Sequence, residues 1–167
     1  RKEILMKKMG SAGTRWLKTI HLFFVCSWVG GALSLLLVFF LSGARIGRGV
    51  YAVDAALKLI DDFVIIPGAL GCLLTGLIYG IWTKWGFFRS KWLTVKWVMT
   101  VVQILFGTFF LGPWLNGSVE ISRSLGEGSL RSPDYLHNGL MNSIWGPVQV
   151  FFLLAMVWIS VARPWRK

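Results

Sequence analysis

The sequence predicts an all-α protein, a transmembrane four-helix bundle with both termini on the cytoplasmic side, and three observations support this. Of the 167 residues, 55% are hydrophobic and only 15% are charged, whereas soluble domains carry about 25% charged residues. The apolar residues gather into four long segments, and a helix needs ~20 such residues to cross a hydrocarbon core of ~30 Å. Ten tryptophans suit the aromatic belts of a membrane protein.

Four helices are expected, and the segments between them differ in polarity. The predicted helices are residues 16–41, 52–82, 92–112 and 139–162, with basic tails at 1–15 and 163–167. The second helix begins with polar turns, in which Asp54 and Lys58 form an i,i+4 pair; these turns should project beyond the hydrocarbon. Residues 113–138 are rich in Gly, Ser and charges, which predicts a long outer loop, either functional or poorly ordered.

The charge balance points to membrane topology rather than to nucleic acid. The formal net charge is +11, but the Lys and Arg residues sit at the ends of apolar segments and form no coherent basic face, as nucleic-acid binding would need. The tails and the turn at 83–91 are the most basic segments. The positive-inside rule therefore places both termini in the cytoplasm and the 113–138 loop outside, as expected for a multi-pass protein of a bacterial inner membrane.

The N-terminal segment and the cysteines exclude some other readings. The basic run and long apolar segment at the N-terminus predict an uncleaved signal anchor, because the apolar run is too long for a cleaved signal peptide. The native start is expected elsewhere than Arg1, and Met6 is a plausible initiator. Cys26 and Cys72 lie inside apolar segments, so neither a disulfide framework nor a CxxC metal motif is predicted.

Two ionisable residues lie inside predicted helices at similar depth. His21 is the sixth residue of the first helix and Lys96 the fifth of the third, and both helices enter from the same side. Ionisable residues in membrane helices normally face the bundle interior and mark functional sites. His21 and Lys96 are therefore expected to approach each other or to share a ligand, or else to form a buried contact joining two helices.

The third helix carries a single polar stripe. Lys96, Thr100, Gln103 and Gly107 follow at i, i+4, i+7 and i+11 among large apolar residues, a spacing that places them on one helical face. That face should contact protein and leave lipid to the other faces.

The two histidines are too far apart to hold one haem within a subunit. His137 lies at the outer end of the fourth helix, about a membrane thickness from His21. Haem iron can nevertheless be held by one His, with Met, Lys or an open position opposite. His21 is then the candidate metal ligand, and Lys96 and Met99 are the candidates opposite it.

Short motifs follow one another along the chain: W-L-K-T-I-H at 16–21, W-V-G-G at 28–31, Pro-Gly at 67–68, Gly76, and W-L-T-V-K at 92–96. They resemble those of HemJ-type protoporphyrinogen oxidases and related CopD-like membrane proteins, and of uncharacterised four-helix bacterial membrane proteins of similar length. In that family a W/F-x-K-x-x-H motif precedes W-x-G-G, then Pro-Gly, a glycine and W-L-x-x-K. Here the motifs match residues 16–21, 28–31, 67–68, Gly76 and 92–96. The resemblance implies that haem b is bound and that His21 and Lys96 are the functional pair. Lys96 is thus the candidate catalytic residue, and the candidate cofactor-binding residues are His21, Lys96, Met99, Trp28, Thr100 and Gln103.

The chain also departs from that family, and two alternatives stay open. The polar residues expected near the outer end of the first helix are replaced by apolar ones after Ser34. A redox reaction on a tetrapyrrole or quinone is therefore one hypothesis. The second is a non-enzymatic subunit or assembly factor that forms a homo-oligomer or docks a membrane partner through its outer loop, and the third is a small metal-handling transporter.

Overall fold

The computed structural model describes residues 10–42, 49–82 and 91–162, and every element in these ranges is helical. The predicted tail at 163–167, most of that at 1–15 and the turn at 83–90 lie outside the described residues. The elements are α1 (Ser11–Leu41), α2 (Val50–Ile60), η2 (Asp61–Ile65), α3 (Ile66–Trp82), α4 (Lys91–Phe106), η3 (Gly107–Leu111), α5 (Gly112–Leu125), η4 (Gly126–Arg131) and α6 (Pro133–Ala162).

Four continuous helical stretches are long and apolar enough to cross a membrane, as the sequence predicts. They are Ser11–Leu41, Val50–Trp82, Leu93–Arg131 and Pro133–Ala162. The 31 residues of α1 span about 46 Å at 1.5 Å per residue, more than the ~30 Å of the hydrocarbon core. The chain is therefore a multi-pass membrane protein, and α1 is longer than the hydrocarbon core is thick.

Two of the four stretches contain a π-helical turn just before a proline. The π-turn η2 ends two residues before Pro67, and η3 ends two residues before Pro113. Proline lacks an N–H and clashes with the carbonyl of residue i−4 in a regular α-helix. A π-turn replaces the regular i→i+4 bonds there, and each stretch continues through its proline.

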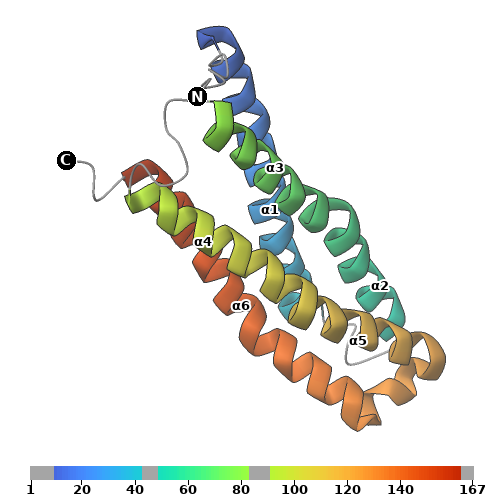
Figure 1. Ribbon diagram of the computed structural model, residues 1–167. Coiled ribbons are helices and arrows are strands. Elements are labelled where there is room, and N and C mark those ends of the chain that lie inside the picture. The colour runs from blue at the N-terminus through green and yellow to red at the C-terminus, as the bar shows by residue number, and fades with distance from the viewer. Residues whose placement is uncertain (1–9, 43–48, 83–90, 163–167) are drawn as a thin grey trace, which may run out of the picture.

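The helices form two pairs that diverge at one end of the bundle (Figure 1). Helix α1 packs along α3, and α4 packs along α6. Ser11, Trp82, Lys91 and Ala162 mark the end where the pairs diverge, here called the terminal end. At the opposite, distal end, α5 packs against both α2 and α6 and brings the pairs together.

The core lies where the pairs meet, around Trp28, which is buried together with Ala69, Cys72, Leu153 and Met156. Helices α1 and α3 approach closely here because α3 has a glycine at the contact. A Cβ on Gly68 would lie 2.7 Å from the backbone nitrogen of Trp28. Small residues allow this kind of close helix packing in membranes.

The prediction of a loop at 113–138 is wrong, because helices fill most of that range. Helix α5 runs to Leu125, η4 follows it, and α6 starts at Pro133 rather than at 139. The buried face of α5 is Leu115, Ser118 and Ser122, packed at the distal end. Both serines bond to a backbone carbonyl of the preceding turn, so a face that composition assigns to a loop can be buried in a helix.

A buried carboxylate joins two of the distal helices. Asp54 of α2 is fully buried, and it accepts a 2.9 Å hydrogen bond from the hydroxyl of Tyr135 on α6. A buried charge is tolerated only when it is hydrogen-bonded or paired. The polar first turns of α2, expected to project from the hydrocarbon, thus pack against the polar helix α5.

Candidate functional site

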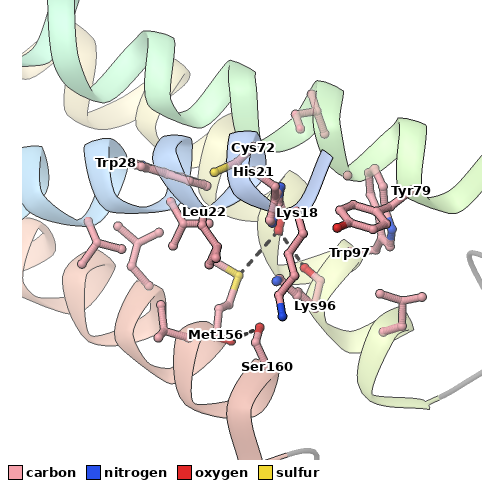
Figure 2. A pocket seen from close by; sticks show the side chains of 18 of the residues that line it. Lys18, His21, Leu22, Trp28, Cys72, Tyr79, Lys96, Trp97, Met156 and Ser160 are labelled. Carbon is pink, nitrogen blue, oxygen red and sulfur yellow. Dashed lines mark hydrogen bonds between the residues drawn. The ribbon is translucent and has the colours of Figure 1, made fainter. Parts of the chain in front are cut away.

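A cavity of about 730 Å³ lies at the terminal end between the two diverging helix pairs. All four long helices contribute to its wall: α1 with Lys18 and His21, α3 with Tyr79, α4 with Lys96, and α6 with Met156. Figure 2 shows these side chains around a common space. Its volume falls in the range of about 300–1,000 Å³ that is usual for cofactor and ligand pockets.

His21 is held by a hydrogen bond to Thr75, a residue that the sequence analysis did not single out. The distance from His21 Nδ1 to Thr75 Oγ1 is 2.7 Å, and Thr75 Oγ1 donates to the backbone oxygen of Gly71 at 2.5 Å. A threonine hydroxyl has one proton to donate, and Thr75 uses it on Gly71. Thr75 must therefore accept from His21, so Nδ1 carries a proton; when the ring is neutral, the lone pair is on Nε2.

Tyr79 supports the same ring from a second direction. Its ring meets the His21 imidazole edge-on, with centroids 6.0 Å apart and an interplanar angle of 84°. The Tyr79 hydroxyl donates to the backbone oxygen of Thr14 at 3.3 Å. Contacts from two turns of α3 thus restrict the orientation of His21, as partners of metal-binding histidines commonly do.

The described cavity lining contains two lysines and no acidic neighbours. Lys96 is half-buried in its wall and Lys18 is exposed at its terminal rim. No Asp or Glu belongs to the lining, and neither lysine forms an ion pair with an acidic residue in the part of the chain that the structure describes. Uncompensated charge in a membrane helix is costly, so the cavity is electrostatically suited to an anionic ligand.

His21 and Lys96 both line this cavity, as do Trp28 and Thr100. Their role as a functional pair stays a prediction. Trp28, only 4% exposed, connects the lining to the core. Thr100 donates to the Lys96 backbone oxygen at 2.9 Å and faces Met156 Sδ at 3.7 Å.

Met99 and Gln103 are placed elsewhere. Neither belongs to the lining formed by the described residues; Met99 packs against the core cluster. Gln103 is buried and donates from Nε2 to the backbone oxygen of Gln149 at 3.0 Å. The polar stripe of α4 does face protein, as predicted. Lys96 and Thr100 of this stripe line the cavity, whereas Gln103 connects α4 to α6.

His137 lies at the other end of the molecule. It is exposed in the first turns of α6, whereas the cavity meets α6 at Met156 and Ser160. Nineteen residues of helix separate His137 from Met156, or about 28 Å at 1.5 Å per residue. The prediction that one group cannot reach both histidines is confirmed.

The remaining donors of the lining are few and of mixed kind. The cavity wall contains the imidazole of His21, the thiol of Cys72 and the thioether of Met156. Among the described residues, no group of three or more His, Cys, Asp or Glu side chains is placed to hold a metal ion. A scan against protein-family models and searches of curated proteins and of solved structures found no match to this chain.

Proposed function

We propose that the chain is a membrane haem-b protein in which Nε2 of His21 is the axial ligand. The observation that carries this proposal is the hydrogen bond between His21 Nδ1 and Thr75, which orients an imidazole at a cavity wall and leaves Nε2 as the ring nitrogen for a metal. A single histidine suffices to hold haem iron. Histidines that bind metals almost always donate their other ring N–H to a fixed acceptor.

The rest of the lining suits such a cofactor. Apolar walls from Leu22, Val25, Leu153 and Val157 match a porphyrin, and Lys18 at the rim matches its acidic side chains. Haem b, when bound, supplies one-electron chemistry. The chain itself binds and orients it, and excludes water from the apolar depth of the cavity.

Lys96 is proposed as the catalytic residue of a redox reaction on a tetrapyrrole or quinone. Its amine lies in the same cavity as His21 but on a different helix, so it can hold or deliver a proton at Nζ beside a bound substrate. Positioned acids and bases of this kind typically contribute about 10²–10⁴-fold to a rate.

The proposed orientation places the terminal end, and with it the cavity, on the cytoplasmic side of a bacterial inner membrane. The chain segments that flank this end are basic: Arg1, Lys2, Lys7, Lys8, Arg15, Lys84, Arg89, Lys91, Arg163, Arg166 and Lys167. Lys and Arg next to membrane helices favour the cytoplasm.

The visible spectrum of the protein tests the cofactor proposal. The protein is purified in mild detergent from haem-replete cells, as wild type, His21→Ala and His137→Ala. We expect a Soret band in the wild type and in His137→Ala, since His137 is exposed at the distal end, and its loss in His21→Ala. A colourless wild type would contradict the proposal and favour a non-enzymatic subunit; an unchanged spectrum in His21→Ala would exclude His21 as the ligand.

A further inference from the structure

The exposed residues of the cavity lining lie on α1 and α6, and none of the described lining residues on α3 or α4 is exposed. Leu22 of α1 and Val157 and Val161 of α6 all line the cavity, yet they are 50%, 37% and 80% exposed. On the opposite side, between α3 and α4, the indole of Trp97 lies against Gly76, where a Cβ would be 3.4 Å from Cζ2. An apolar opening on a membrane-spanning surface faces acyl chains rather than water.

The lining contains polar residues near the terminal end and is mostly apolar next to the core. Thr14, Lys18 and Ser160 line it near the terminal end, within one turn or two of the helix ends. Val25 and Leu153 line it further toward the core. A ligand with one polar end and one long apolar body, lying across the leaflet, is complementary to this order.

The charges define the polar end of that ligand. Lys18 and Lys96 are the ionisable amines of the lining, and no acidic residue of the described chain pairs with either. Lys18 is exposed at the rim while Lys96 is half-buried within the cavity. A carboxylate between them would neutralise charge that is otherwise uncompensated close to hydrocarbon.

We infer that the cavity admits an acidic single-chain lipid sideways from the adjoining leaflet, through a portal lined by Leu22, Val157 and Val161, with its carboxylate between Lys18 and Lys96. Binding of this lipid needs no haem, because it uses the opening and the lysines rather than His21. Haem and the lipid would share Lys18, Leu22 and Val157, so the labelling is done on protein freed of haem.

Photolabelling in a defined bilayer tests the inference. The full-length protein, in nanodiscs of zwitterionic lipid, is irradiated with a diazirine-bearing palmitic acid, and labelled peptides are mapped by mass spectrometry. We expect saturable labelling of α1 near Leu22 and of α6 near Val157. Unlabelled palmitate should compete about tenfold better than hexadecanol, which has the same chain without the charge. Equal competition by palmitate and hexadecanol, or labelling that does not saturate, would overturn the inference. This result needs only the wild-type protein.

Variants with matched controls distinguish the contribution of the lysines to lipid binding from that of the portal. Lys96→Gln should lower the saturable labelling about tenfold, whereas Lys58→Gln, which removes a lysine paired with Asp62 outside the cavity, should not. Val157→Trp should block the portal with both lysines present. Val148→Trp, at an exposed position of α6 outside the lining, should leave labelling unchanged. Labelling that survives both Lys96→Gln and Val157→Trp would refute the site.

Failure here is distinct from failure of the haem proposal. A colourless protein with saturable, acid-dependent labelling would keep the lipid site and reject the cofactor. A protein with a Soret band that depends on His21, but without saturable labelling, would reject the lipid site and keep the cofactor.

Discussion

Thr75→Val is the substitution that most sharply separates an oriented imidazole from a merely buried one. Valine has nearly the shape of threonine but no hydroxyl, so it removes the acceptor for His21 Nδ1–H and the donor to Gly71 O. Because Thr75 is only 5% exposed, water cannot easily replace either bond.

The expected size of the effect follows from the lost hydrogen bond. Leaving a buried donor unpaired costs about 1–3 kcal/mol, while hydrogen bonds between membrane helices average ~0.6 kcal/mol and reach ~1.7 kcal/mol. A loss of about 1 kcal/mol in the free energy of unfolding is thus expected. Removing the partner of a metal-binding histidine typically weakens binding about 10–100-fold, so haem affinity should fall more than stability does.

Haem titration of the purified apoprotein measures the affinity, and a redox titration measures the midpoint potential. Loss of the Nδ1–H bond makes the imidazole a weaker donor to iron, so the potential should rise in Thr75→Val. Thr75→Ser keeps the hydroxyl and should restore both values. The reasoning is refuted if Thr75→Val binds haem as tightly as the wild type with an unchanged potential, or if Thr75→Ser is as defective as Thr75→Val.

Three further predictions concern the frame of the site. Tyr135→Phe leaves the buried carboxylate of Asp54 short of a hydrogen bond and should lower the free energy of unfolding by about 1.5–3 kcal/mol, as read by thermal unfolding, without altering the haem spectrum; an unchanged melting temperature would show that this bond contributes nothing. Gly68→Ala brings a Cβ against the backbone of Trp28 and should destabilise by about 1–3 kcal/mol, whereas Gly30→Ala, with nothing within 4 Å of its Cβ, should not; equal effects would contradict the close approach of α1 and α3. A C-terminal fusion should be fluorescent with green fluorescent protein and inactive with alkaline phosphatase, and an active phosphatase would reverse the proposed orientation.

The membrane spans were predictable because their signal is long-range and repetitive. A run of apolar residues fixes the span whatever it packs against, and the helix-faced spacing of Lys96, Thr100 and Gln103 correctly indicates a protein-facing stripe. His21 and Lys96 line one cavity because α1 and α4 both begin at the terminal end of the bundle.

The helix α5 and the partner of His21 were not predictable in the same way. Ser118 and Ser122 are buried in α5 because each satisfies its own hydroxyl on the preceding turn, a local solution that composition does not distinguish from a loop. Thr75 meets His21 only because α3 turns that face toward α1. Its signal was the spacing of Gly71, Thr75 and Tyr79 at i, i+4 and i+8, one face with a small residue for close approach and two side chains able to hydrogen-bond.

The stripe of α4 shows the limit of a periodic argument. The spacing correctly predicts that Gln103 and Lys96 share one helical face. It does not follow that both residues line the same cavity. A helix rises about 10 Å over the seven residues between them. That distance is enough for Lys96 to reach the cavity while Gln103 contacts the backbone of Gln149.

The most direct measurement of the central claim, that His21 is the iron ligand, is chemical rescue of His21→Gly by imidazole. The substitution removes the side chain and leaves space beside Thr75, in which free imidazole can take the same hydrogen bond. The account predicts that His21→Gly is colourless or spectrally altered and that millimolar imidazole restores the wild-type Soret band, whereas His137→Gly needs no rescue. A wild-type spectrum in His21→Gly without imidazole, or a wild-type protein that takes up no haem at all, would contradict it.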